Sequence, residues 1–250
     1  MQYKKSSIFM EDIKRAVANL GFAMGVAGLT IMLMRTVLIF GKTPGEVSVL
    51  EICAYPMALS GFTIFSAAFP AWAYASSFYK EKKVGYSYFI LSRMSWKKYV
   101  SMRICSVGVS GFLIMAIPLA ITFAYAYGIG AKEIGPLFEG MHVREVILEL
   151  GLPAVLCIKI CLGGLYGVFW ALVGFLSAML IKNKYAPYLI PFILNQFLWI
   201  VFSKIPKLNP VLLVRGEDLD SYGRSAGILL LYCIVAVVLN LLVFRRRVVQ

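Results

Sequence analysis

Residues 76–103 read SSFYKEKKVGYSYFILSRMSWKKYVSMR and lie between two long apolar stretches. The segment carries one acid and seven basic residues: Glu81, and Lys80, Lys82, Lys83, Arg93, Lys97, Lys98 and Arg103. Lys and Arg accumulate in the short cytoplasmic loops of membrane proteins. We therefore expect this segment, the basic loop, to lie in water on the cytoplasmic side.

The basic loop also has a helical pattern. Gly85 offers a break in the chain, and the apolar side chains after it recur at helical spacing: Tyr86, Phe89, Ile90, Met94 and Tyr99. This pattern predicts a short amphipathic helix held against the inner membrane face, where a soluble partner can reach it. The alternative is a positively charged loop that only fixes the topology.

The composition indicates a multi-pass membrane protein of the cell membrane. Of its 250 residues, 60% are hydrophobic and 15% charged, whereas a soluble domain carries about 25% charged residues. The net charge of +13 does not indicate a nucleic-acid partner, because the basic residues cluster beside apolar spans, as anionic lipid headgroups favour. We expect one all-α transmembrane domain over residues 1–250.

The apolar runs predict six transmembrane helices, at about 20–40, 49–75, 104–127, 160–181, 186–202 and 226–244. Residues 1–19 are amphipathic and predict an elbow helix along the inner leaflet. Basic residues gather in the segments that this topology places inside, and acids gather in the outer loops. Both termini are therefore expected in the cytoplasm.

Prolines and glycines indicate irregular places within this topology. Pro56 and Pro70 predict kinks in the second span. The Gly151–Pro153 break predicts an outer interfacial segment at 146–158, with Lys159 at the outer boundary and its ammonium reaching up to headgroups. The proline-rich part of the loop at 203–225 is expected to dip back into the outer leaflet.

No set of catalytic residues is visible. The only histidine, His142, lies in a predicted outer loop, which leaves a Ser-His-Asp arrangement without support. Gly41-Lys42-Thr43 resembles the end of a phosphate loop, but Thr36 stands where the first glycine is required. The five cysteines lie in or beside apolar runs and are read as packing residues rather than metal ligands. The chain is expected to be no enzyme and to bind no metal.

Polar residues inside the predicted spans are candidates for a substrate path, because charges are costly in hydrocarbon. Arg35 and Glu51 fall at similar depths near the outer ends of the first two spans. They can form a pair or contact a substrate, or Arg35 can extend to the outer headgroups. Asn195 and Gln196, in the middle of the fifth span, can line the path or form hydrogen bonds to another helix.

These features together resemble the ABC-2 type permeases, the membrane subunits of ATP-binding-cassette exporters. The resemblance rests on the elbow helix, the six spans, the proline-rich re-entrant segment and a pattern in the basic loop. That pattern is Glu81-Lys82, Gly85, Leu91, Ser95, Tyr99 and Arg103, with Met94 where the family pattern has proline.

The resemblance implies that residues 85–98 form a coupling helix seated in a separate ATPase subunit. The implied coupling residues are Glu81, Gly85, Tyr86, Ile90, Leu91, Arg93, Met94, Ser95, Trp96 and Lys97. Two ATPase copies and a second permease subunit would complete the assembly, with ATP and Mg²⁺ in the ATPases and no cofactor on this chain. The implied cargo is amphipathic or hydrophobic, including peptides.

Two other classes remain open on the sequence. A secondary transporter is disfavoured by the scarcity of acids inside spans and by the lack of a clear internal repeat. A membrane-embedded enzyme or scaffold is disfavoured by the missing catalytic residues.

Overall fold

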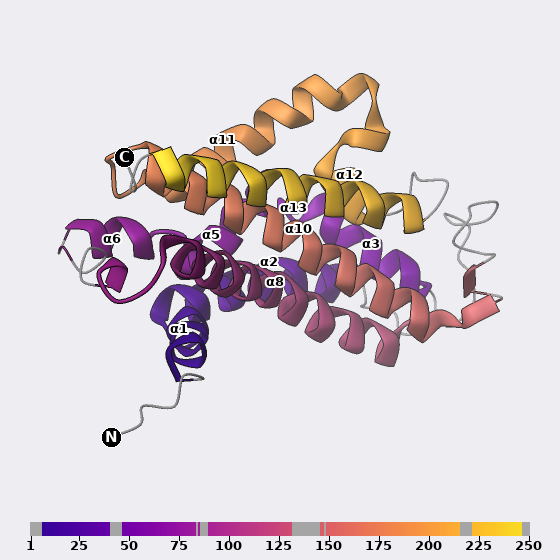
Figure 1. The fold of residues 1–250 in the computed structure, drawn as a ribbon. Coiled ribbons are helices and arrows are strands. Elements are labelled where there is room, and N and C mark those ends of the chain that lie inside the picture. Colours follow the sequence, from indigo (N-terminus) through magenta and orange to yellow (C-terminus); the bar gives the residue numbers. More distant parts are fainter. Residues whose placement is uncertain are drawn as a thin grey trace.

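The computed structural model of the chain describes residues 7–40, 47–83, 85, 90–131, 146–147, 149–215 and 222–246. Its helices, in chain order, are α1 (Ser7–Val17), α2 (Leu20–Phe40), α3 (Val49–Leu59), α4 (Phe62–Phe65), α5 (Phe69–Tyr74), α6 (Ser77–Lys83), α8 (Trp96–Ile129), α10 (Leu152–Leu180), α11 (Ala186–Val201), the 3-10 helices η2 (Phe202–Lys204) and η3 (Pro206–Leu208), α12 (Pro210–Arg215) and α13 (Tyr222–Phe244) (Figure 1). For the described part of the chain, the predicted all-α class is confirmed.

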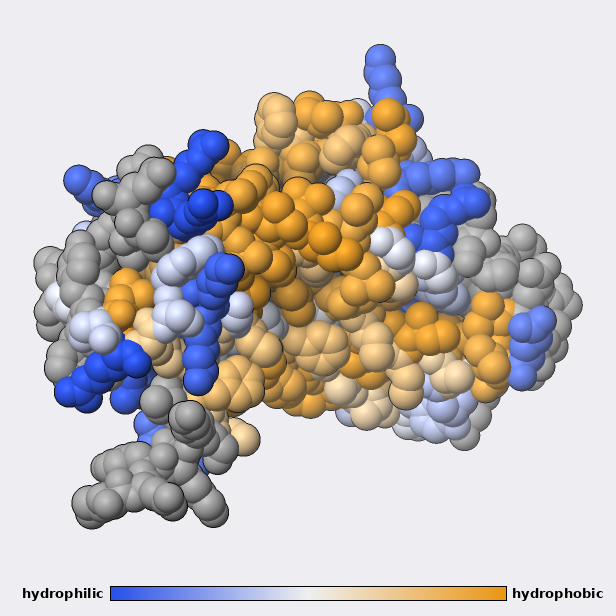
Figure 2. All heavy atoms as spheres, viewed as in Figure 1, coloured by the Kyte–Doolittle hydropathy of each residue, from blue (hydrophilic) through white to orange (hydrophobic). Residues whose placement is uncertain are grey.

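Among the described residues, five helices are long and apolar enough to cross a membrane: α2, α8, α10, α11 continued by η2, and α13. Figure 2 shows hydrophobic residues over the middle of the visible face and hydrophilic residues toward its two ends. Large apolar side chains such as Leu20 and Ile31 are 75% and 70% exposed, as lipid contact requires. The chain is therefore a multi-pass helical membrane protein.

The centre of the bundle is α10, which packs against α8, α11 and α13. Its most apolar stretch is 67% buried, compared with 28% for α2 and α13. The α8–α10 contact is close because glycines meet there: a Cβ on Gly167 would lie 2.2 Å from the carbonyl oxygen of Gly111. Small residues allow two helix backbones to approach in this way, so α8 and α10 form the tightest pair.

Residues 49–75, expected as one kinked span, form the three short helices α3, α4 and α5. The chain turns at Gly61, whose φ of +82° favours glycine. It turns again before Pro70, which has no N–H to donate to the preceding turn. The expected kinks at Pro56 and Pro70 were therefore only partly right: Pro56 lies inside α3, whereas the helix ends, instead of bending, at Gly61 and before Pro70.

Two long helices begin earlier than expected. The third predicted span was to begin at 104, but α8 begins at Trp96 and includes the end of the basic loop. The fourth was to begin at 160, but α10 begins at Leu152, directly after Gly151 with its φ of +83°. Residues 152–158 are thus the first turns of the helix that follows this glycine, and their place in the outer interface stays a prediction.

The last part of the chain follows the prediction more closely. Helix α11 covers almost all of the fifth predicted span, and α13 begins four residues before the sixth. Between them, η2, η3 and α12 lead the chain back against α10 and α13. Pro210, Val211, Leu213 and Val214 of α12 are buried there. The Tyr232 hydroxyl donates to the carbonyl of Leu208 at 2.7 Å.

Candidate functional site at the base of the basic loop

The basic loop consists of α6, an exposed Gly85, a turn after Ile90 and Leu91, and the first two turns of α8. Gly85 has a φ of +76°, so the chain can change direction directly after α6. Ser95, in extended conformation, is the N-cap residue of α8. Tyr86 lies outside the described residues.

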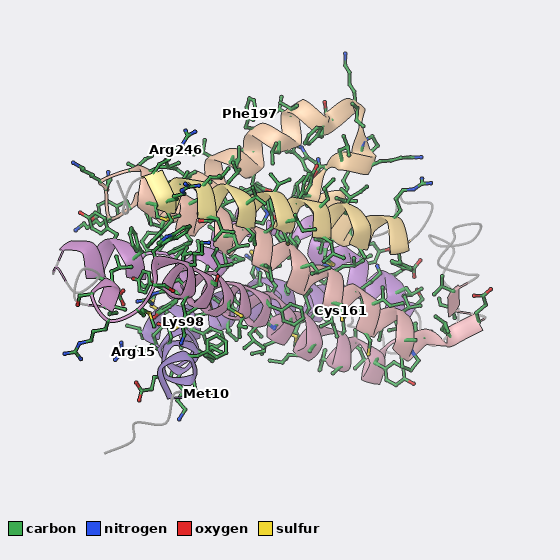
Figure 3. The ribbon with its side chains drawn as sticks, in the orientation of Figure 1. Met10, Arg15, Lys98, Cys161, Phe197 and Arg246 are labelled. Atoms are coloured by element: carbon green, nitrogen blue, oxygen red, sulfur yellow. The ribbon has the colours of Figure 1, made fainter. Side chains whose placement is uncertain are left out.

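The predicted coupling residues divide into two groups. Four apolar side chains pack, partly buried, against the core of the chain itself: Ile90, Leu91, Met94 and Trp96. Arg93, Ser95 and Lys97 are exposed. The surface that the described loop presents to a soluble partner is therefore polar and basic. Arg15, Lys98 and Arg246 lie at this same end of the molecule (Figure 3).

Arg103 is buried beneath the basic loop. Its side chain is 1% exposed, although it lies only two turns into α8. Nη1 lies 2.8 Å from Oδ1 of Asp12 on α1, and Nη2 forms an ion pair with Glu81 on α6. Asp12 is itself only 5% exposed. A buried guanidinium needs such partners, because only their charges and hydrogen bonds offset the unfavourable free energy of removing it from water.

Two tyrosines complete what we call the Arg103 cluster: Asp12, Tyr74, Glu81, Tyr99 and Arg103. Tyr74 on α5 accepts a hydrogen bond from Arg103 and donates one to Asp12. The Tyr99 hydroxyl donates to Glu81 Oε2 at 3.0 Å. The guanidinium carbon lies 5.1 and 5.5 Å from the two ring centroids, which is cation–π geometry. The cluster thus connects α1, α5, α6 and α8.

An aromatic group continues from this cluster into the C-terminal half. Phe244 at the end of α13 lies 5.7 Å from both Tyr99 and Phe78, measured between ring centroids. Phe78 on α6 also meets Phe175 on α10 edge to face at 6.0 Å. All four rings are at most 1% exposed. Displacement of α6 therefore acts on α10 and α13 through direct contacts.

Arg35 and Glu51 do not form an ion pair with each other in the described part of the chain. Arg35 is exposed on α2. Glu51 is 6% exposed and its carboxylate accepts from the N–H and the hydroxyl of Ser48, at 3.2 and 3.0 Å. Glu51 thus forms a capping box at the start of α3. The suggested pair was wrong, and a substrate contact by either residue stays a prediction.

Asn195 and Gln196 hydrogen-bond to the broken region between α3 and α5. Asn195, 1% exposed, donates from Nδ2 to the carbonyl of Thr63 at 2.9 Å, and Gln196 donates to that of Ile64 at 2.9 Å. The Tyr166 hydroxyl donates to Asn195 Oδ1 at 3.3 Å. The two amides therefore satisfy carbonyls at the helix break, as the helix–helix alternative predicted. A role in the path stays a prediction.

Lys159 was expected at the outer boundary with its ammonium reaching up to headgroups; the headgroup contact was wrong, and the position at the boundary stays a prediction. Its side chain is fully buried on α10, and Nζ donates to the carbonyl oxygen of Arg215 at 3.0 Å. Arg215 is the last residue of α12, so the ammonium meets the negative end of a helix. The sequence did not reveal this partner because it lies 56 residues away.

The sequence did not predict the Arg103 cluster as a site, although Glu81, Tyr99 and Arg103 belong to the pattern quoted for the basic loop and the inner acids carried a further signal. Only three acids, Glu11, Asp12 and Glu81, fall on the predicted inner side among many bases. Two of these three are the acids that hold Arg103. No group of three or more metal-ligating side chains occurs in the described residues, and the expectation that the chain binds no metal stays a prediction.

The class that the fold and the site define is a multi-pass helical membrane protein with a buried ion cluster beneath a basic loop. No protein-family model, curated protein or solved structure matches the sequence. The resemblance to the ABC-2 type permeases therefore depends on the residues and the architecture of this chain, and its functional consequences are proposals.

Proposed function

We propose that this chain is the permease subunit of an ATP-binding-cassette exporter in the cell membrane. The five long helices and the α3–α5 segment make six crossings, with both termini in the cytoplasm and α1 along the inner leaflet. Two copies of a separate ATPase subunit bind and hydrolyse ATP with Mg²⁺. A second permease subunit completes the transport path, and this chain binds no cofactor of its own.

The observation that carries this proposal is the Arg103 cluster. A partner that moves the basic loop moves α6, and Glu81 and Arg103 connect α6 to α8 and α1. Phe78 extends the connection to α10 and α13. A loop that only fixed the topology would not need a buried ion pair to the spans. This geometry supports coupling of loop movement to rearrangement of the helices.

The docking surface follows from which side chains the loop exposes. Leu91 and Met94 pack on their own chain, so the contact with the ATPase uses Arg93 and Lys97 instead. We expect a complementary acidic groove on the ATPase, because opposite charges speed association and fix the register.

An apolar groove supports an amphipathic or hydrophobic cargo. It lies between α10, α11 and α13 and has a volume of about 290 Å³. Phe169 and Tyr232 line it on one side and Leu194 and Leu198 on the other. Phe197, on the same helix as the leucines, points away from the bundle (Figure 3). In this proposal the apolar part of a peptide or lipid-like cargo enters at the less buried side of α11.

A second candidate, a secondary transporter, is favoured by Lys159. A fully buried lysine within a candidate span is a functional hypothesis by default. The two candidates differ in energy source. Transport by an ATPase-coupled permease stops with vanadate, whereas transport by an ion-coupled carrier stops when an ionophore collapses the ion gradient.

Co-purification tests the proposal. The tagged chain, expressed with its native genomic neighbourhood, should retain an ATPase subunit and vanadate-sensitive ATP hydrolysis. The Arg93→Glu/Lys97→Glu variant should lose the ATPase and remain folded, because both side chains are exposed. Lys182→Glu, an exposed charge reversal between α10 and α11, is the matched control and should retain it. Purification of the wild-type chain without any ATPase would refute the proposal.

A further inference from the structure

A pocket of about 420 Å³ lies beside α1, at the same end as the Arg103 cluster. The end of α1, Asn19 and the start of α2 form one wall, and residues of α5, α6 and α11 form the other, among them Trp72, Ser77 and Tyr188. Asn19 fixes the first wall: its side chain donates to the carbonyl of Arg15 at 2.9 Å and accepts from the N–H of Phe22 at 2.9 Å. The pocket is thus built from secondary structure on both sides.

One end of the pocket is polar. Arg15 contributes a guanidinium to the lining. The hydroxyl oxygen of Ser77 is buried and has no hydrogen-bond partner in the described part of the chain. Its neighbour Ser76, 5% exposed, already accepts from the Tyr188 hydroxyl at 2.8 Å. A buried hydroxyl without a partner, in a pocket lined by a guanidinium, fits an anionic oxygen.

The outer end of the pocket opens onto apolar surface. Leu20 and Met24 line it and are 75% and 52% exposed. Both belong to α2, whose apolar side chains continue from there along a candidate membrane span. Trp72, half-buried, forms the opposite side. A ligand that satisfies both ends carries an anionic head and a hydrocarbon chain.

We propose that this pocket binds the headgroup of an anionic phospholipid, with its phosphate at Arg15 and Ser77 and its acyl chain along α2. Of the two acids on α1, Asp12 is paired with Arg103, and Glu11 is exposed to solvent. A free phosphate ester lacks the tail that Leu20 and Met24 would cover. The proposal does not depend on ATP coupling, so either can fail alone.

Fluorescence quenching by brominated lipids tests this site, because Trp72 reports from within the pocket. The full-length chain is placed in phosphatidylcholine nanodiscs containing a small fraction of brominated phosphatidylglycerol or brominated phosphatidylcholine. The fluorescence of Trp72 is obtained by subtracting the tryptophan fluorescence of the Trp72→Phe variant from that of the wild-type protein. We expect saturable quenching by the anionic lipid and weak quenching by the same fraction of the zwitterionic one. Equal quenching by the two lipids would overturn the proposal.

Two charge variants locate the contact. Lys14→Gln removes an exposed cation that is next to Arg15 but does not line the pocket. This variant should bind phosphatidylglycerol about fivefold more weakly than the wild type, because one cation is lost from the general attraction to an anionic surface. Arg15→Gln should bind phosphatidylglycerol at least about tenfold more weakly than Lys14→Gln, as loss of a charge-assisted hydrogen bond implies. Equal affinities of the two variants would overturn the site.

Soluble glycerol phosphate separates a lipid from a free anion. We expect no relief of quenching at concentrations that match the lipid, because the tail contributes to binding. Relief at equal concentration would show a site for soluble anions and overturn the lipid assignment. Circular dichroism and gel filtration of each variant confirm that it is folded.

Discussion

Replacement of Arg103 by glutamine is the most direct test of the buried cluster. Glutamine cannot neutralise Asp12, which is 5% exposed and would remain as an unpaired buried carboxylate. Breaking a buried pair in this way costs about 3–5 kcal/mol. Glu81 contributes less to this cost, because it is 16% exposed and keeps the hydrogen bond from Tyr99. At about 2–4 °C per kcal/mol for a chain of this size, the unfolding midpoint should fall by about 10 °C.

The assay is thermal unfolding in detergent, followed by helical circular dichroism and by the monodisperse peak on gel filtration. Arg246→Gln, an exposed change of the same type at the same end, is the control and should stay within about 0.5 kcal/mol of the wild type. Adding Asp12→Asn to Arg103→Gln should recover part of the loss, because it removes the unpaired charge. A midpoint of Arg103→Gln equal to that of Arg246→Gln would refute the role of the cluster.

Two further predictions concern the packing that holds the helices in place. Gly167→Ala should destabilise the chain by about 1–3 kcal/mol, because its Cβ would meet the facing backbone at 2.2 Å. The control Gly227→Ala, with open space around it, should be neutral. Equal thermal midpoints of the two variants would contradict this prediction. Asn195→Ala should lower the stability by about 1–3 kcal/mol, because it leaves the carbonyl of Thr63 unsatisfied. Gln196→Ala should lower the stability less, because its hydrogen bond is exposed. The reverse order of the two thermal midpoints would contradict this prediction.

Hydropathy predicted the long helices well, because it measures how strongly each side chain prefers lipid to water. In lipid-facing helices such as α13, this preference largely determines the sequence. It predicted the interruptions poorly. Whether the helix ends after Phe65 or continues into α5 depends on whether the freed carbonyls of Thr63 and Ile64 find donors. Those donors are Asn195 and Gln196, 132 residues further along the chain. No local pattern contains that pairing.

The same reasoning explains the charged residues. The sequence placed Lys159 at a headgroup boundary and Arg103 in an exposed loop, because an isolated charge avoids hydrocarbon. Each instead has a partner from a distant segment: the end of α12 for Lys159, and Asp12, 91 residues away, for Arg103. Composition predicts which charges are costly to bury, but only the tertiary fold determines where a partner makes burial possible.

The distribution of rigid and interrupted helices bears on how the proposed permease would move. Helices α8 and α10 are in backbone contact through Gly111 and Gly167, so they can hardly slide without a clash. The interrupted segment α3–α5 has its turns at Gly61 and before Pro70, and it continues directly into α6 and Glu81. Force applied at the basic loop therefore reaches α3–α5, which can bend at its turns, and the α8–α10 pair, which cannot. In the proposed exporter, α3–α5 and the less buried α11 rearrange while α8 and α10 keep their contact.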